Sequence, residues 1–252
     1  MEREKFVNIL EKININLSSE QLDQFDTYYE LLVKWNEFMN LTGITDYDEV
    51  LIKHFVDSLA VFNAVCELSA KDQDIREKLD FNNNLSVADI GTGAGFPGLP
   101  IKIAFPDTEV LLLDSLNKRI KFLDEVVGQL GLQKIDTVHA RAEDGARNVL
   151  YREKYMLGVS RAVANLSTLC EYVLPFVAVG GYFAAYKSGD IDEEINSSKK
   201  AVELLGGEIT HVYRFNLPDT DYRRSIVFIK KKKATPKKYP RKSGLPSKEP
   251  LG

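Results

Sequence analysis

The chain has 252 residues, 44% of them hydrophobic, which is enough for one full α/β domain with an attached element. Its two cysteines, Cys66 and Cys170, are far apart and outside any metal-ligand spacing, which excludes a disulfide framework and a zinc site. The first residues are charged, and the longest apolar stretch is interrupted by Pro175 and Gly180. We therefore expect no signal peptide, no membrane span and a cytoplasmic protein.

The net charge of −4 conceals a strong asymmetry along the chain. Residues 230–252 carry nine Lys or Arg and one acid, Glu249, a balance of +8 that leaves −12 for residues 1–229. Such a basic tail either keeps the protein soluble or binds nucleic acid, because clustered Lys and Arg release counterions from phosphates. Its Lys, Pro and Gly content, without apolar periodicity, predicts that residues 231–252 are disordered without a partner.

The first third of the chain is predicted to be helical. Residues 18–21 resemble a capping box, and apolar residues follow at helical spacing, which predicts a helix over about 19–39 after a shorter one. Residues 46–48 can cap another helix, in which Leu51, Phe55 and Leu59 lie on one stripe. Residues 1–80 therefore form a helical N-terminal element.

Residues 81–230 alternate between strand and helix, which predicts a parallel sheet with helices on both faces. No helix separates the last two strands, so we expect them to pair antiparallel. This Rossmann-like, mostly parallel seven-stranded sheet with a C-terminal antiparallel hairpin is the fold of class I S-adenosylmethionine methyltransferases. The predicted strands are 85–90, 109–113, 137–140, 156–160, 181–186, 208–214 and 225–229.

The first predicted strand ends in a glycine-rich loop, Asp89-Ile90-Gly91-Thr92-Gly93-Ala94-Gly95. In a doubly wound fold this position lies near the switch point at which ligands bind. Glycines permit a tight turn and let backbone amides approach a ligand. The dinucleotide fingerprint requires its third glycine where this chain has Phe96, whereas this spacing behind an acid is the methyltransferase arrangement.

Two prolines argue against a ligand that carries phosphate. Pro97 and Pro100 are predicted in the first turn of the next helix, where proline is tolerated. A pyrophosphate would bind the N–H groups that these prolines lack. S-adenosylmethionine has no phosphate, and Asp89 can help to orient its amino group, so we predict this cofactor.

Carboxylates follow the second and third predicted strands. Asp114 lies about 20 residues beyond the glycines, where a carboxylate can accept hydrogen bonds from both ribose hydroxyls. Alternatively, it caps the helix that starts near Asn117. Glu143 or Asp144 can accept the adenine amino group, with capping or solvation as the alternative.

The segment after the fourth strand indicates which chemical groups the protein could methylate. Exocyclic amine methylation usually needs an Asn or Asp followed by two prolines and an aromatic residue, and this chain has Ser160-Arg161-Ala162-Val163-Ala164 instead. Methylation of a pyrimidine carbon needs a cysteine nucleophile, and neither cysteine follows a strand in a suitable motif. Guanine N7 needs no base, because its lone pair is already nucleophilic. Arg161 can then position a guanine edge or a phosphate, contact the cofactor carboxylate, or pair with an acid in the fold.

Six segments together closely resemble the ribosomal RNA small subunit methyltransferase G family, formerly called glucose-inhibited division protein B. The similarity runs from about residue 20 to the tail. The segments are residues 35–36, 40–42, 53–58, 89–100, 114–119 and 160–164.

The resemblance implies N7-methylation of one guanosine in the decoding-region loop of bacterial 16S rRNA. The partner would be 16S rRNA or the small ribosomal subunit, and we expect a monomer. By the same resemblance, the cofactor contacts are Gly91, Phe96, Asp114, Ser115, Leu116, Ala142, Glu143 and Arg161, to which the loop adds Asp89, Gly93 and Gly95.

The remaining candidates are possible RNA contacts. His54, Asp57 and Ser58 share one helix face, which either approaches the cofactor pocket or the RNA, or forms a local His–Asp pair. The arginines among the candidates either contact RNA phosphates or, as the alternative, are simply solvated at the surface. A small-molecule methyltransferase and a non-catalytic RNA-binding or assembly protein are the other functions compatible with the sequence. The RNA-binding candidates are His54, Arg119, Arg223, Arg224, Lys237, Lys238, Arg241 and Lys242.

Overall fold

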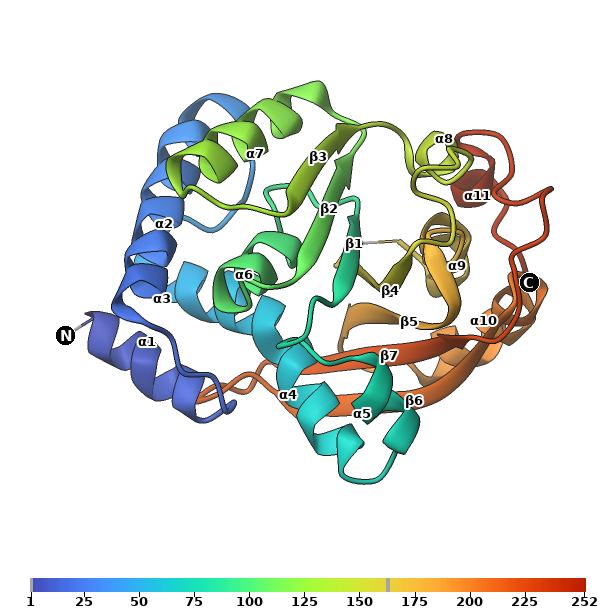
Figure 1. The fold of residues 1–252 in the computed structure, drawn as a ribbon, viewed down its shortest axis with the longest axis horizontal. Coiled ribbons are helices and arrows are strands. Elements are labelled where there is room, and N and C mark those ends of the chain that lie inside the picture. The colour runs from blue at the N-terminus through green and yellow to red at the C-terminus, as the bar shows by residue number, and fades with distance from the viewer. Residues whose placement is uncertain (1, 162–163) are drawn as a thin grey trace.

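The computed structural model describes residues 2–161 and 164–252, so Ala162 and Val163 of the segment after the fourth strand lie outside the described residues. Seven strands form one central sheet, and helices cover both of its faces (Figure 1). The strands are β1 (Ser86–Ile90), β2 (Glu109–Asp114), β3 (Ile135–His139), β4 (Tyr155–Ser160), β5 (Val177–Ser188), β6 (Gly207–Asn216) and β7 (Arg223–Lys231). The helices are α1 (Glu2–Glu11), α2 (Ser19–Met39), α3 (Tyr47–Val50), the π-helix η1 (Leu51–Val56), α4 (Asp57–Ser69), α5 (Gln73–Lys78), α6 (Gly98–Ala104), α7 (Asn117–Gln129), α8 (Ala142–Gly145), α9 (Leu166–Val173), α10 (Asp192–Leu204) and α11 (Leu245–Lys248).

The sheet has the predicted topology. Its strand order is β3-β2-β1-β4-β5-β7-β6, with all neighbours parallel except β7, which runs antiparallel to both β5 and β6. The fold class expected from the sequence is therefore confirmed. The chain leaves β1 toward β2 on one side and returns to β4 on the other, so the carboxyl ends of β1 and β4 form the switch point.

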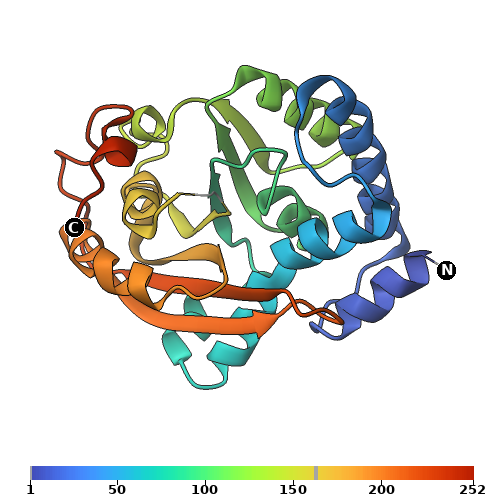
Figure 2. The ribbon, with the colours of Figure 1, turned by 180° about the vertical axis from the view of Figure 1, so that it is seen from behind.

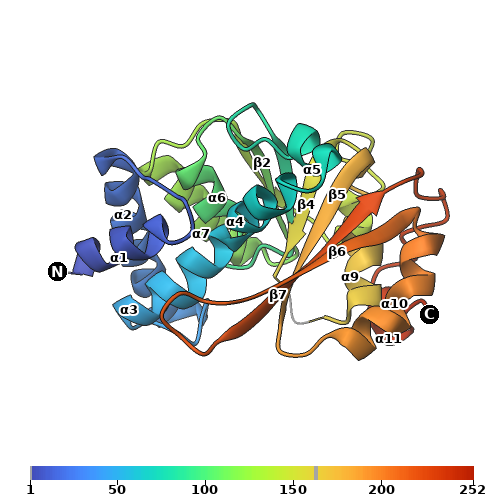
Figure 3. The ribbon, with the colours of Figure 1, turned by 90° about the horizontal axis from the view of Figure 1, so that it is seen from below.

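Two hydrophobic clusters, one on each face, hold the layers together. Helices α2, α4, α6 and α7 cover one face, and α9 and α10 cover the other, as the views from behind and from below also show (Figures 2 and 3). Phe25 of α2 and Phe55 of η1 belong to the same cluster as Val87 and Leu112 of the sheet. The N-terminal helices thus share their core with the sheet.

The helix over 19–39 is confirmed as α2, and its capping box is present: the Ser18 hydroxyl accepts from the Gln21 N–H, and the Gln21 side chain accepts from the Ser18 N–H. The next predicted helix is correctly capped by Asp46, but it is not one α-helix. It runs through α3, η1 and α4, with a π-helical stretch in the middle. π-Helical turns inside α-helices are often found at functional sites.

The prediction of a disordered tail is wrong for this structure. Residues 232–252, here called the C-terminal strap, fold back over α9, form α11 beside α8 and then return toward α10, where the chain ends (Figure 1). Thr235 and Tyr239 are buried, and the Arg241 guanidinium pairs with Glu171 of α9, which is fully buried. Composition suggested disorder because it does not reveal that the body of the protein supplies a buried acid as a partner.

The body also neutralises part of the basic charge before the strap. Lys230 pairs with Asp74 at 2.8 Å, and Lys231 is buried with Glu153 at 3.3 Å. The charge asymmetry of the sequence is thus smaller at the surface than along the chain. Within the described ranges, no helix combines the length and the apolar character that crossing a membrane requires.

Candidate functional site

A cavity of about 460 Å³ opens at the carboxyl ends of β1 to β4, where the sheet topology predicts a ligand. It contains five of the predicted cofactor residues together with Arg119, and the C-terminal strap contributes two more residues. Its lining is Ile90, Gly91, Leu113, Asp114, Ser115, Arg119, Ala140, Arg141, Ala142, Glu143, Ser160, Ala164, Leu169, Tyr172, Gly244 and Ser247.

Asp89 holds the glycine loop from within the protein. Its side chain is completely buried, and one carboxylate oxygen, Oδ2, accepts from the Thr92 hydroxyl at 2.7 Å and the Gly98 N–H at 2.8 Å. Burial raises the pKa of Asp89 to about 7, although these hydrogen bonds oppose the shift. Its other oxygen, Oδ1, is buried without a hydrogen-bond partner among the described residues. The sequence could not show that the Asp89 carboxylate already accepts hydrogen bonds from the loop and the start of α6.

The N-terminus of α6 has little capacity for phosphate. Pro97 is the N-cap, one position before the predicted first turn, and Pro100 lies within that turn. The Gly98 N–H is bound to Asp89, and the Leu99 N–H donates to the Gly95 carbonyl at 2.8 Å. The donors that would bind a phosphate are therefore either missing or already paired.

Asp114 lies where the glycine loop meets the end of β2. Its Oδ2 accepts from the Gly93 N–H at 3.0 Å and from Arg119 at 3.2 Å, and its Oδ1 accepts from the Leu116 N–H at 2.9 Å. Leu116, rather than Asp114, is the N-cap of α7, so the capping alternative does not describe Asp114. The structure thus places Arg119, a predicted RNA contact, in the lining of the first cavity, where it is bound to Asp114.

Glu143 lies in α8, lines the same cavity and is buried. Its Oε1 accepts from the N–H of Gly244 in the strap at 2.7 Å. Asp144, the other candidate for the adenine amino group, is near Ser243 at 3.4 Å and does not line the cavity. Of the two acids, the structure places Glu143 in the cavity wall.

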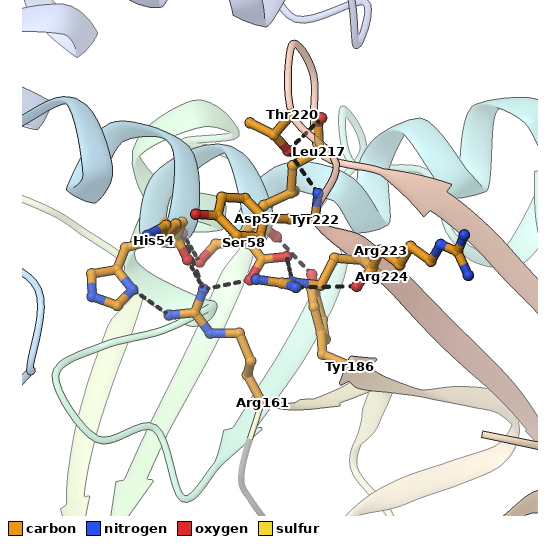
Figure 4. Close-up of polar contacts among 11 residues, drawn as sticks. His54, Asp57, Ser58, Arg161, Tyr186, Leu217, Thr220, Tyr222, Arg223 and Arg224 are labelled. Atoms are coloured by element: carbon orange, nitrogen blue, oxygen red, sulfur yellow. Dashed lines mark hydrogen bonds and ion pairs between the residues drawn. The ribbon is translucent and has the colours of Figure 1, made fainter. Parts of the chain in front are cut away.

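Arg161 lies in a second cavity, of about 360 Å³, which shares Ala164 with the first. Its Nη1 donates to Asp57 Oδ2 at 3.1 Å, and Arg224 donates from the opposite side to Oδ1 at 3.2 Å (Figure 4). Asp57 is buried, so two guanidinium groups share one desolvated carboxylate. The lining comprises Asp57, Arg161, Ala164, Asn165, Tyr186, Lys187, Ser188, Glu194 and Arg224.

The π-helix gives Arg161 its backbone acceptors. Arg161 Nη1 also donates to the carbonyls of Lys53 at 3.0 Å and His54 at 3.3 Å, both within η1. The His54 carbonyl also accepts from the Asp57 N–H and the Ser58 hydroxyl, so the arginine adds to the hydrogen bonds that η1 already makes. Of the alternatives left by the sequence, the structure shows Arg161 paired with an acid, joining the N-terminal helices to the end of β4.

His54 is enclosed and neutral in this site. Its Nδ1 faces Arg161 Nη2 at 3.2 Å, and its ring stacks on Phe96 with the centroids 4.5 Å apart. Burial, together with the charge of Arg161, lowers the pKa of His54 to about 3. A neutral Nδ1 accepts from Arg161, which leaves Nε2 to donate to the Thr42 hydroxyl at 2.7 Å. His54 therefore carries no positive charge that could attract a phosphate group.

This neutral His54 predicts a pH-dependent loss of stability. Its folded-state pKa lies below the ordinary value of 6.5, so the unfolded chain binds the proton first. The free energy of unfolding should fall as the pH falls from about 6.5 toward about 3. His54→Gln does not titrate, so urea unfolding at pH 7 and pH 5 should show a shallower loss for this variant. Equal slopes for the two proteins would contradict the neutral assignment.

The predicted cofactor residues thus divide into two groups. Gly91, Asp114, Ser115, Ala142 and Glu143 line the first cavity. The others lie outside its lining. Asp89, Gly93 and Gly95 belong to the glycine loop and its support, Phe96 lies against Arg161 of the second cavity, and Leu116 is the exposed N-cap of α7.

Sequence reasoning missed Tyr172, Gly244 and Ser247 in the first cavity and Tyr186 in the second. Tyr172 and Tyr186 lie in apolar runs, where they resemble ordinary core residues. Gly244 and Ser247 lie in the strap that was predicted to be disordered. No local signal distinguishes any of them.

Comparison with known proteins identifies the family. The family model for rRNA small subunit methyltransferase G matches residues 21–226. The chain belongs to the rRNA small subunit methyltransferase G family. The resemblance seen in the sequence is thereby confirmed.

Similarity to individual family members extends over almost the whole chain. The ribosomal RNA small subunit methyltransferase G of Acetivibrio thermocellus is 52% identical over 237 residues, covering 94% of this chain and 91% of that protein. The protein of the same name from Lachnoclostridium phytofermentans is 48% identical over 246 residues, covering 98% and 96%. Among solved structures, M. jannaschii TYW2 in complex with AdoMet has a TM-score of 0.49 and 14% identity, covering 64% of this chain and 80% of that one.

Proposed function

We propose that this methyltransferase G family member transfers a methyl group from S-adenosylmethionine to N7 of one guanosine in the decoding-region loop of bacterial 16S rRNA. The observation that carries the proposal is the pair of adjoining cavities at the switch point, one lined by Asp114 and the other by Arg161. We further propose a cytoplasmic monomer that acts on 16S rRNA or the small subunit.

The residues of the first cavity fit a cationic cofactor without phosphates. Its volume of about 460 Å³ lies within the range of small-molecule sites. Asp114 would hold the ribose hydroxyls, Gly91 would approach the methionine end, and Ala142 and Glu143 would contact the adenine. The lack of a phosphate cradle at α6 supports this choice.

The second cavity is suited to the acceptor nucleotide. It adjoins the first at Ala164, and Arg161 and Arg224 give it two guanidinium groups around Asp57. When bound, S-adenosylmethionine supplies a methyl group on a sulfonium, which the N7 lone pair of guanine accepts without prior deprotonation. The work of the protein is then to position the base and exclude water.

The exposed tip of the β6–β7 hairpin is suited to docking RNA. Tyr222 is 44% exposed, with Lys53 Nζ 4.8 Å and Arg224 Cζ 5.9 Å from the centroid of its ring. Bases stack on such rings while nearby cations meet phosphates. Arg223 is exposed at the same tip and extends this surface, whereas the exposed Lys237, Lys238 and Lys242 lie on the C-terminal strap beyond the opposite end of β7 and form a second basic surface (Figure 1). Arg241 is excluded from it because its guanidinium is bound to Glu171.

The test is methyl transfer from tritiated S-adenosylmethionine to naked 16S rRNA and to small subunits from cells that lack this modification. Label at one guanosine of the decoding-region loop, located by primer extension after chemical cleavage at N7-methylguanosine, is the expected result. The same RNA transcribed with 7-deazaguanosine should take up no label, because it lacks N7. Absence of label in every assembly state, or equal labelling of the 7-deaza RNA, would refute the proposal.

A further inference from the structure

The C-terminal strap contributes to the cavity that we assign to the cofactor. Gly244 and Ser247 line it from the strap, whereas its other lining residues come from the β1–α9 region. Ser247 is exposed, so it lies at the open side of the cavity. Gly244 has a φ of +82°, a left-handed conformation that favours glycine, and its N–H points to Glu143.

A buried ion pair keeps the strap in place. Glu171 is 0% exposed, and its two oxygens accept from Arg241 through the backbone N–H at 2.7 Å, Nε at 3.0 Å and Nη2 at 2.7 Å. A carboxylate buried this deeply is costly unless it is paired and hydrogen-bonded. Detaching the strap would expose or orphan Glu171, so the docked position is strongly favoured.

Contacts on both sides of Arg241 extend this attachment. Arg152 donates to the carbonyl of Thr235 at 2.8 Å, and Arg147 donates to that of Pro240 at 2.7 Å. Beyond Arg241, the Thr168 hydroxyl donates to the Pro246 carbonyl at 3.0 Å. The strap is therefore fixed immediately before and within the segment that reaches the cavity.

We propose that the C-terminal strap is part of the cofactor site, with Gly244 orienting Glu143, Ser247 forming the outer wall of the adenosyl end, and the Arg241–Glu171 pair holding both in position. The inference rests on the proposed function for the identity of the ligand. Arg241 and Glu171 are positioning residues, because they act on the cavity through the strap.

The experiment measures the affinity of the full-length protein for S-adenosylmethionine and S-adenosylhomocysteine by calorimetry, without RNA. Arg241→Ala and Glu171→Gln should each weaken binding by about tenfold or more, since the cavity wall and the Gly244 hydrogen bond to Glu143 are loosened together. Lys233→Ala is the matched control: it removes an exposed charge from the same strap and should leave the affinity unchanged. In the wild type, S-adenosylhomocysteine should also slow hydrogen exchange in residues 241–249.

A second variant does not depend on the buried pair. Ser247→Trp adds a large side chain at an exposed position, so it should block the cavity while the melting temperature stays close to that of the wild type. Tight binding by Ser247→Trp, or wild-type affinity in folded Arg241→Ala, would overturn the role of the strap and leave the proposed function intact. A wild-type protein that binds neither ligand would overturn the proposed function itself. If the protein binds S-adenosylmethionine and the strap variants weaken that binding, but no rRNA is labelled, the role of the strap is supported and the proposed rRNA substrate is refuted.

Discussion

Asp57→Ala is expected to lower the free energy of unfolding by about 3–5 kcal/mol, because it leaves two partly buried guanidinium groups without their shared carboxylate. Arg161 and Arg224 have side chains only 16% and 22% exposed, and the Asp57 side chain is 6% exposed. For a chain of this size each kcal/mol shifts the melting temperature by about 2–4 °C. Urea denaturation and thermal unfolding both measure the effect.

The control for Asp57 is another ion pair that joins the N-terminal helices to the β6–β7 hairpin. Lys12 and Asp219 are 2.7 Å apart, but their side chains are 51% and 60% exposed. Asp219→Ala should therefore cost about 1 kcal/mol or less. If Asp57→Ala lowers the free energy of unfolding by no more than Asp219→Ala does, the two arginines have found other partners in the variant. The free energy of unfolding of Asp57→Asn should lie between those of the two alanine variants, because the amide keeps one acceptor oxygen but loses the charge.

Asp114→Ala is expected to weaken S-adenosylmethionine binding by about a hundredfold or more. The carboxylate is proposed to accept both ribose hydroxyls, and a hydrogen bond to a charged group is worth about 1.5–3 kcal/mol. The same change also releases the N–H groups of Gly93 and Leu116, which loosens the cavity wall. Calorimetry with S-adenosylmethionine and S-adenosylhomocysteine measures the loss, and both ligands should lose affinity equally because they share the ribose.

Asp136→Ala provides the matched control, since Asp136 is an exposed acid on the neighbouring strand β3. Its affinity for both ligands should equal that of the wild type. Unchanged affinity in a folded Asp114→Ala protein would remove Asp114 from the cofactor site. Such a result would also favour a non-catalytic protein that retains the fold.

Where the relevant interactions are local, the sequence predicted the structure closely. The Ser18 capping box, the seven strands and the final hairpin follow from residue spacing over short windows. The position of the glycine loop at the switch point follows from strand order, because a strand–turn–helix connection in a parallel sheet leads to the same edge. Residues at the ends of β1, β2 and β3 were therefore predicted to share a site.

Long-range electrostatic pairing could not be predicted in the same way. Arg161, His54 and Arg119 looked like groups available to bind a ligand, yet each has a partner in the fold. Arg161 and Asp57 are separated by 104 positions in the chain, and no local pattern links them. Whether a charge is available to a ligand depends on what the fold brings within about 4 Å of it.

By itself, the sequence determined the fold class, the place of the ligand cavity and, through its motifs, the family. These properties depend on periodicity, glycine spacing and strand order, which are carried by neighbouring residues. Only the tertiary structure decided that the basic tail is a docked strap, that His54 is neutral and that Asp57 joins two arginines. Each of these depends on burial beside a residue distant in the chain, because desolvation decides which charges must be paired.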